Sequence, residues 1–327
     1  MKVLVTGGAG YIGSHLVKHL LAETEHEVLV LDNLSTGHSE ACGKVQFIKM
    51  DLADFSAVGA LLYEFKFDAV VHFAASSLVS ESFESPFQYY SNNTANTLNL
   101  INASAMAGVG YFIFSSTAAV YGEPGVSRIP LTEYCLLNPI NPYGRSKLAS
   151  EWALRDIAVA SEMKYGILRY FNVCGADREG RLGESHDPET HLIPLLAKTV
   201  LGKRPNFSIF GRDYDTPDGT CIRDYVDVED LARAHLDVLN YLLAGHGSDV
   251  FNCGYGHGYS VQEVIDAMQR AAGKAISVTT AARRQGDPPV LVADASKLKQ
   301  LTGWQPKNND LINICESVLN WEKNARY

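Results

Sequence analysis

A tyrosine and a lysine lie four residues apart in the segment NPYGRSKLASEWAL, residues 141–154. Pro142 suits the first turn of a helix, where its missing N–H donor costs little, and most of the following residues are good helix formers. Residues four apart share one helix face, so the Tyr143 phenol and the Lys147 ammonium can approach the same point. Because a nearby cation lowers the pKa of a phenol, the pair could transfer protons near neutral pH.

Three hydroxyl side chains follow the apolar run YFIFSS, at Ser115, Ser116 and Thr117. If this run is a strand of an open parallel sheet, its carboxyl end lies where ligands bind. Thr117, Tyr143 and Lys147 then form a plausible proton-transfer set for oxidising an alcohol, as hydrogen-bonding group, base and pKa modifier. The simpler alternative for Thr117 is a hydroxyl that caps a loop.

A glycine-rich segment near the N-terminus could hold a dinucleotide. In VLVTGGAGYIGSHLVKHLL, Gly7, Gly10 and Gly13 lie between a predicted strand and an amphipathic helix, as close approach to a pyrophosphate requires. Asp32 ends the second predicted strand, where a carboxylate can accept hydrogen bonds from a ribose 2′-hydroxyl but would repel a 2′-phosphate. The pattern therefore predicts NAD rather than NADP. Asp51, after the third strand, could contact the adenine or simply cap a helix.

These residues need a scaffold of parallel strands. Short apolar runs that lack polar alternation fit strands buried on both faces of a helix-covered sheet. Their alternation with helical stretches predicts an α/β fold with a doubly wound parallel sheet (Rossmann) and a smaller C-terminal α/β substrate-binding region. We predict a cofactor-binding domain over residues 1–175, with return segments near 222–252, and a mainly substrate-binding domain over 176–327. The six runs are KVLVTG, EVLVLD, VQFIKMD, DAVVHFAA, YFIFSS and YGILRYFN.

Composition narrows the class of protein. Of 327 residues, 46% are hydrophobic and 20% charged, and no apolar run approaches the ~20 residues that span a bilayer. A formal net charge of −9 offers no general attraction to nucleic acid. The N-terminal segment lacks the features of a signal or transit peptide, which predicts a cytoplasmic location. The six cysteines are single, without a metal-ligand spacing, so we predict no metal.

Motifs along the whole chain resemble the extended short-chain dehydrogenase/reductase family, and in particular its UDP-sugar 4-epimerases. The segment DGTCIRDYVDV, residues 218–228, is similar to that subgroup rather than to the family at large. The other motifs that carry the resemblance are VTGGAGYIGSH, DNLSTG, VVHFAA, YYSNNTANTLNL, FSSTAAVYG, NPYGRSK, LRYFNVCGA and RRQGDPPVLVADASK.

The resemblance implies that the chain interconverts UDP-galactose and UDP-glucose with retained NAD. Tyr143 would take the proton of the sugar 4-hydroxyl, Thr117 would bond the same hydroxyl, and Lys147 would bind the nicotinamide ribose and lower the pKa of Tyr143. A 4-keto sugar would turn in the site and be reduced on its other face. The implied cofactor-binding residues are Gly7, Gly10, Tyr11, Ile12, Gly13, Asp32, Asn33, Asp51, Leu52, Phe73, Ala74, Ala75, Asn93, Ser115, Tyr143, Lys147 and Tyr170.

The resemblance also implies a UDP-sugar site in the C-terminal region. Arg223 and Arg284 would clamp phosphate oxygens, which suits the fork geometry of guanidinium groups, although an Arg-Asp pair such as Arg223-Asp224 is more often a surface or interface ion pair. Leu291 matches the position whose size limits the group at sugar C2, so its intermediate size leaves N-acetylated sugars possible. The implied substrate-binding residues are Ser77, Thr117, Asn172, His191, Phe210, Arg223, Arg284, Asp287 and Leu291.

Some residues depart from the best-known bacterial pattern. Ser77 replaces a lysine that reaches the pyrophosphate in certain epimerases, His191 stands where asparagine also occurs, and Val173 replaces a common proline.

A nucleotide-sugar 4,6-dehydratase would need an acid and a base directly after the threonine. The chain has Ala118 and Ala119 there, which cannot transfer protons.

Two other functions stay open. A UDP-glucuronate or UDP-pentose 4-epimerase would share the C4 chemistry, and a non-catalytic regulator could sense NAD without turning over a sugar.

Helices near 86–107 and 143–163 carry apolar surface that could pair in a homodimer, as is common in the family, or pack on the chain's own sheet.

Overall fold

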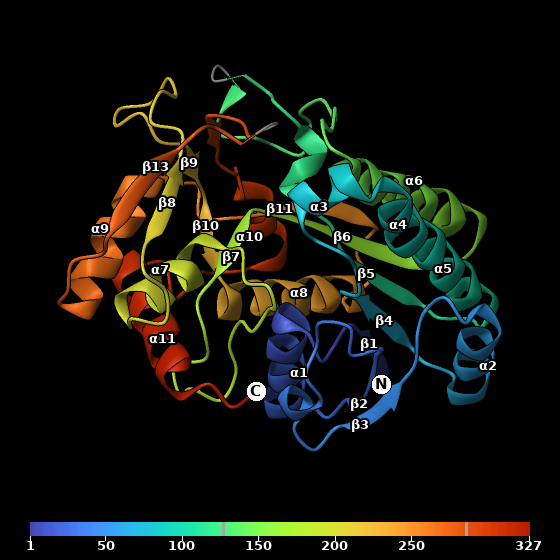
Figure 1. Ribbon diagram of the computed structural model, residues 1–327. Coiled ribbons are helices and arrows are strands. Elements are labelled where there is room, and N and C mark those ends of the chain that lie inside the picture. Colours follow the sequence, from blue (N-terminus) through green and yellow to red (C-terminus); the bar gives the residue numbers. More distant parts are fainter. Residues whose placement is uncertain (126–127, 285–286) are drawn as a thin grey trace.

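A computed structural model describes residues 1–125, 128–284 and 287–327, and its largest element is a parallel sheet. The strand order is β11-β6-β5-β4-β1-β2-β3, and each neighbouring pair is parallel. This confirms the predicted doubly wound fold (Figure 1). The strands are β1 (Lys2–Thr6), β2 (Glu27–Asp32), β3 (Gln46–Lys49), β4 (Ala69–His72), β5 (Tyr111–Ser115), β6 (Lys164–Tyr170) and β11 (Asp249–Cys253).

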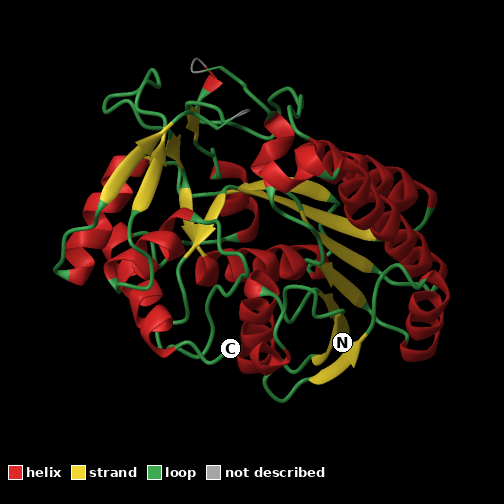
Figure 2. Cartoon of the chain, viewed as in Figure 1, coloured by secondary structure: helices red, strands yellow, loops and turns green. Residues whose placement is uncertain are grey.

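Helices cover both faces of this sheet because its side chains alternate between them. Val3 and Val5 of β1 pack toward one helix layer, whereas Leu4 packs in the other. The first layer contains α1 (Tyr11–Glu23), α8 (Val228–Leu243) and α10 (Ser296–Thr302). The second contains α2 (Phe55–Phe65), α5 (Thr97–Met106) and α6 (Pro142–Ala160). Figure 2 shows the strands between the two layers.

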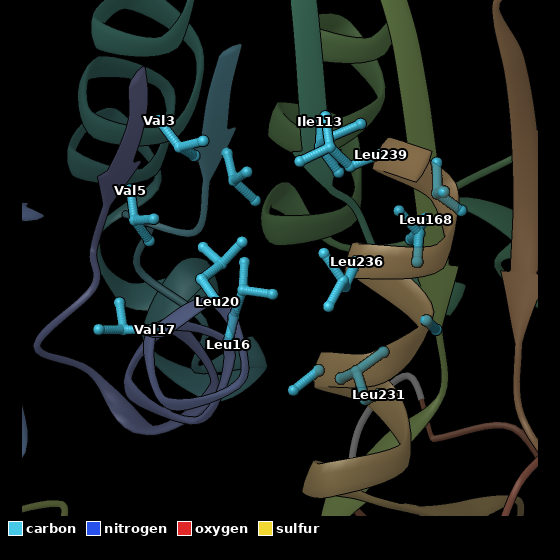
Figure 3. Packing of buried hydrophobic residues seen from close by; sticks show 14 of the residues in the cluster. Val3, Val5, Leu16, Val17, Leu20, Ile113, Leu168, Leu231, Leu236 and Leu239 are labelled. Carbon is cyan, nitrogen blue, oxygen red and sulfur yellow. The ribbon is translucent and has the colours of Figure 1, made fainter. Parts of the chain in front are cut away.

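The first layer joins distant parts of the chain. In Figure 3, Leu16, Val17 and Leu20 of α1 lie below β1, and Leu231, Leu236 and Leu239 of α8 lie beside β5 and β6. All of these side chains are buried in one cluster, which also includes Phe251 and Cys253 of β11. The sheet is therefore completed by a helix and a strand from beyond residue 220.

The smaller C-terminal region has its own apolar core. Side chains of α7 (Leu192–Val200), α9 (Val261–Ala272) and α11 (Leu311–Asn324) pack there against β8 (Phe207–Phe210) and β13 (Val278–Ala281). Capping explains the start of α9, where Ser260 and Glu263 form a capping box. Shorter strands line the boundary with the large sheet: β7 (Asn172–Cys174), β9 (Ile222–Arg223), β10 (Tyr225–Asp227), β12 (Tyr259–Ser260) and β14 (Val290–Leu291).

Short elements complete the chain near the carboxyl ends of the strands. The helical segment predicted near 86–107 consists of α4 (Pro86–Tyr89), a π-helix (Tyr90–Asn96) and α5. It follows α3 (Val79–Glu84), and the 3₁₀ turns are Ser39–Cys42 and Ala118–Tyr121. None of the helices in the described ranges is both long and apolar enough to cross a membrane.

Candidate functional site

The glycine loop joins β1 to α1 with very little space. Gly7 has φ +73°, and a Cβ there would lie 2.5 Å from the backbone nitrogen of Ala74. A Cβ at Gly13 would overlap the carbonyl oxygen of Gly7. Only glycine fits at both positions, and the result is a helix N-terminus at the carboxyl edge of the sheet, next to the end of β4. This arrangement suits a pyrophosphate.

Asp32 is held in position at the end of β2. Its Oδ2 accepts a hydrogen bond from the Ala9 N–H at 3.0 Å, and its Oδ1 accepts one from the Leu34 N–H at 2.8 Å. Burial raises the pKa of this carboxyl, and the two backbone donors oppose that shift. Each oxygen keeps another lone pair that can accept a ribose hydroxyl. The glycine loop and Asp32 together fit NAD.

The neighbouring residues of the predicted adenine pocket have structural roles as well. Asn33 Nδ2 donates to Asp51 Oδ2 at 2.8 Å, and Asp51 Oδ1 accepts from the Ala53 N–H at 2.8 Å. Asp51 thus closes a turn beside Asn33, and the helix cap offered as its alternative is instead Asp54, the N-cap of α2. Leu52 packs into the core against the α2 layer.

Asn93 is fully buried in the π-helix and holds two other segments together. Its Oδ1 accepts from the Ser76 N–H at 2.8 Å, and its Nδ2 donates to the Ser76 carbonyl and to Ser146 Oγ, at 2.9 and 3.2 Å. Its side chain therefore fixes the loop after β4 against α6. Contact between Asn93 and a cofactor stays a prediction.

Other predicted cofactor residues surround this edge of the sheet. Tyr11 donates its hydroxyl to the Gly175 carbonyl at 2.6 Å, which ties the start of α1 to the C-terminal region. Ser115 donates to the Tyr170 hydroxyl at 3.1 Å, joining the ends of β5 and β6. The remaining predicted positions are partly buried at the start of α1 or just after β4: Ile12, Phe73, Ala74 and Ala75.

Helix α6 begins at Pro142, as predicted, and its first turn is tightly packed. Asn141 caps the helix, since its Oδ1 accepts from the Gly144 N–H at 2.8 Å. A Cβ at Gly144 would lie 2.6 Å from the carbonyl oxygen of Ala119, so glycine permits the close contact with the 3₁₀ turn after Thr117. The helix start thereby brings Tyr143 to Thr117.

Thr117 and Tyr143 form the predicted pair. Both residues are buried, and the Thr117 side chain is near enough to the Tyr143 phenol to lower its pKa in part. Thr117 Oγ1 also accepts from the Ala119 N–H at 3.1 Å. The hydroxyl therefore also caps the turn that follows it, as the simpler alternative predicted. The lowered pKa predicted for Tyr143 is wrong for this structure: burial raises it well above the usual value, the charge of Tyr170 raises it further, and only the Thr117 side chain lowers it. The desolvation of the phenolate exceeds any stabilisation by Lys147.

Lys147 lies one turn after Tyr143 on α6 and is buried beneath the site. Its Nζ is 4.4 Å from the centre of the Phe114 ring, a cation–π distance. Burial lowers the pKa of Lys147 to about 7, and the charge of Glu151 raises it in part. A strongly shifted pKa at a buried lysine is typical of a functional site.

Sequence reasoning missed a buried ionic network behind Lys147. Glu151 receives hydrogen bonds from Arg169 Nε at 2.9 Å and Nη2 at 2.6 Å, and from Ser116 Oγ at 2.6 Å. Arg169 Nη1 donates to the Tyr121 hydroxyl at 3.1 Å, which donates to Asn252 Oδ1 at 2.6 Å. The network links α6, the end of β5, β6 and β11 behind Lys147. The spacing of Lys147 and Glu151 was a visible signal for part of it.

The structure brings several predicted substrate residues together in pairs. Arg223 forms an ion pair with Asp287, and its Nη2 also donates to the Pro288 carbonyl at 2.7 Å. Arg284 lies 4.1 Å from the centre of the Phe210 ring. Leu291 of β14 pairs with Arg223 of β9 and packs beside the 3₁₀ turn after Thr117.

Asp224 does not form the surface ion pair with Arg223 that the sequence suggested as an alternative. It is fully buried and accepts the backbone N–H groups of Tyr255, Gly256 and Ala293, at 2.8, 2.9 and 3.2 Å. Arg223 pairs with Asp287 instead.

Three predicted substrate positions lie apart from these pairs. Asn172 begins β7 and Ser77 follows β4, and both are exposed. His191 caps the start of α7, where its Nδ1 lies 2.7 Å from Glu184 Oε1 and 3.1 Å from Glu189 Oε1. The negative charge of Glu184 raises the pKa of His191 well above its usual value.

Known proteins resemble this chain over almost its whole length. Residues 3–254 match the model of the NAD dependent epimerase/dehydratase family. A UDP-glucose 4-epimerase of Azospirillum brasilense is 47% identical, with 98% of this chain and 92% of that protein covered. The crystal structure of UDP-glucose 4-epimerase from Brucella ovis in complex with NAD is 44% identical, with 97% of each chain covered and a TM-score of 0.93. The UDP-Glc/GlcNAc 4-epimerase from Campylobacter jejuni is 52% identical, with 99% of each chain covered and a TM-score of 0.86.

Proposed function

This chain belongs to the NAD dependent epimerase/dehydratase family, and from that premise we propose that it interconverts UDP-galactose and UDP-glucose. The observation that carries the proposal is the buried Thr117 and Tyr143 together with buried Lys147, at the edge of the sheet that bears the glycine loop. The names of the relatives favour this sugar pair over a UDP-glucuronate or UDP-pentose substrate and over a regulator without catalysis.

The residues divide the work at the sugar C4 hydroxyl. When bound, NAD accepts and returns the C4 hydride and adds a positive charge to the pocket. Tyr143 takes the proton of the C4 hydroxyl. Thr117 forms a hydrogen bond to the same oxygen and orients it toward Tyr143. Lys147 binds the nicotinamide ribose, and its charge together with that of bound NAD offsets the burial that raises the pKa of Tyr143. The resulting 4-keto sugar turns about its bonds to the diphosphate, and Tyr143 returns the proton after reduction on the other face.

The residues that bind the UDP part of the substrate are assigned from their charge and hydrogen-bonding groups. Arg223 and Arg284 supply guanidinium groups for the diphosphate, with Phe210 and His191 around the nucleotide, because a diphosphate requires more than one donor. Asp287 holds Arg223 and can also accept a ribose hydroxyl. Asn172 and Ser77 approach from the ends of the strands. We divide the chain accordingly into a cofactor-binding domain, 1–175 with returns near 222–252, and a mainly UDP-sugar-binding domain, 176–327.

The test is an incubation of the purified protein, without added NAD, with UDP-galactose, UDP-N-acetylgalactosamine or UDP-glucuronate in separate tubes. NMR of the products should show UDP-glucose from the first tube, which requires a cofactor retained through purification. Inversion of another sugar alone would overturn the substrate and keep the chemistry. No reaction of any sugar, even with NAD supplied, would favour the NAD-sensing regulator.

Leu291 is expected to set the tolerance for an N-acetyl group at C2. Leu291→Tyr should lower kcat/KM for UDP-N-acetylgalactosamine by about 10- to 200-fold, the usual effect of pocket size, and Leu291→Ala should raise it. Both variants should keep turnover of UDP-galactose within a few-fold. Initial rates on the two substrates check this, and an unchanged ratio in both variants would remove Leu291 from the pocket. The similarity to a UDP-Glc/GlcNAc 4-epimerase supports acceptance of both sugar types.

We also propose a homodimer that pairs α4–α5 and α6 with their copies. Large apolar side chains on these helices point away from the sheet and are exposed: Phe87, Leu98, Met106, Trp152 and Val159. Exposed apolar side chains gathered on two helices that contact each other are typical of an interface. The cytoplasmic location stays a prediction from the sequence.

Trp152→Glu is expected to convert the dimer to a monomer, because an unpaired carboxylate would be buried in the interface. Light scattering at micromolar concentration should give half the wild-type mass. Tyr63→Glu, at a more exposed aromatic residue of α2, is the control and should stay dimeric. A monomeric wild-type protein would refute the interface.

A further inference from the structure

Two histidines and two glutamates converge in the loop between β7 and α7. Glu184, His186, Glu189 and His191 each offer a ligand atom, and these atoms all lie within 4.8 Å of one another. Both carboxylates are almost completely buried, with side-chain exposures of 4% for Glu184 and 3% for Glu189. Burial of two carboxylates in one place requires compensation by positive charge.

The distances suit a tetrahedral metal ion. His186 Nδ1 lies 3.2 Å from Glu184 Oε1 and 3.9 Å from Glu189 Oε2. His191 Nδ1 lies 2.7 Å from Glu184 Oε1 and 3.1 Å from Glu189 Oε1. Ligand atoms about 2.1 Å from a tetrahedral zinc ion are about 3.4 Å apart. The distances of 3.1, 3.2 and 3.9 Å are close to this value, whereas the 2.7 Å distance is that of a hydrogen bond and would lengthen when an ion binds.

Hydrogen bonding leaves one carboxylate oxygen available. Glu189 Oε1 accepts from the backbone N–H groups of Thr190 and His191, at 2.7 and 2.8 Å. Within the described part of the chain, Glu189 Oε2 and His186 Nδ1 are buried and have no hydrogen-bond partner. A buried carboxylate oxygen aimed into a His/Glu cluster is poorly explained by hydrogen bonding, whereas a metal ion would satisfy it.

The surrounding structure fixes the cluster in advance. Trp321 Nε1 donates to the Glu184 carbonyl at 2.9 Å, and Gly183 lies so close to the Trp321 ring that a Cβ would overlap it. Glu189 binds the first backbone N–H groups at the start of α7. The ligands are therefore held by two helices rather than by a free loop.

We propose that Glu184, His186, Glu189 and His191 bind one divalent transition-metal ion of the zinc type. Two carboxylates and two neutral imidazoles balance the charge of such an ion, and both ligand types suit it. The site uses no cysteine, which is why cysteine spacing predicted no metal. The ion would join the loop at 184–186 to the start of α7, and it would take the Nδ1 atom of His191, a residue also predicted to lie near the nucleotide. The competing arrangement has protonated histidines paired with the glutamates and binds no metal.

The test is zinc binding by the full chain after dialysis against a chelator. Calorimetry should show one Zn²⁺ per chain, and the thermal transition should rise when Zn²⁺ is added. Cobalt(II) should give the intense visible absorption of a tetrahedral site. His186→Ala and the nearly isosteric Glu189→Gln should each weaken binding at least about 100-fold, since even loss of an outer-shell partner costs 10- to 100-fold.

His246→Ala, at an exposed histidine after α8, is the matched control and should bind Zn²⁺ like the wild type. The proposal is overturned if the wild type binds no stoichiometric Zn²⁺, or if Glu189→Gln binds it unchanged. Because the readouts are binding and spectroscopy, the result does not depend on turnover of a UDP-sugar.

Discussion

Replacing Tyr143 by phenylalanine is expected to lower kcat by about 100- to 10,000-fold, the usual contribution of a positioned acid–base group. The variant loses only the phenolic hydroxyl, and its ring still packs edge-on against Tyr89, with ring centres 6.3 Å apart. The glycine loop and Asp32 are untouched, so the purified variant should still contain NAD. Product NMR gives the rate, and chromatography of the nucleotide released by denaturation gives the NAD content.

Tyr63→Phe is the control for this prediction, because Tyr63 is exposed on α2, in the helix layer opposite to that of α1. It should keep both rate and NAD content. A Tyr143→Phe variant that epimerises UDP-galactose at the wild-type rate would refute the assignment. A variant that loses NAD as well would show that Tyr143 acts mainly in cofactor binding.

Glu151→Gln is expected to destabilise the protein by about 3–5 kcal/mol, the usual cost of breaking a buried ion pair. Arg169 is buried with 1% exposure and would keep its charge without a carboxylate partner. Burial opposes the charge of this guanidinium, whose pKa is raised mainly by Glu151. Urea unfolding monitored by circular dichroism gives the free energy of unfolding.

Asp156→Asn, at an exposed acid of the same helix, should change stability by less than about 0.5 kcal/mol. The double variant Glu151→Met with Arg169→Met should lose less stability than the sum of the two single variants, because neither charge is left unpaired. Equal losses for Glu151→Gln and Asp156→Asn would contradict the role of the pair.

Local patterns predicted the parts of the fold that local residues determine. The six apolar runs are all strands, and α6 begins at Pro142, because strand burial and helix capping are visible in neighbouring residues. Strand β11 was not recognised, since DVFNC is five residues long and contains two polar side chains. Only its parallel pairing with β6, some 80 residues earlier, makes it a strand.

The site shows the same division between local and long-range causes. Gly7, Gly13 and Asp32 were predicted from spacing, since a tight turn and a strand end have local signatures. The sign of the pKa shift of Tyr143 was not, because burial depends on the whole fold. Arg169 was missed for a related reason: its partner Glu151 lies 18 residues away on another element.

The completion of the large sheet by α8 and β11 bears on how this protein can be recombined. A chimaera with a single crossover near residue 175 would combine the first six strands with a foreign helix and edge strand. The apolar contacts among α1, α8 and β11 would then have to match across two parents. Exchange of the cofactor-binding half therefore requires at least two crossovers, one on each side of the segment that returns to the sheet.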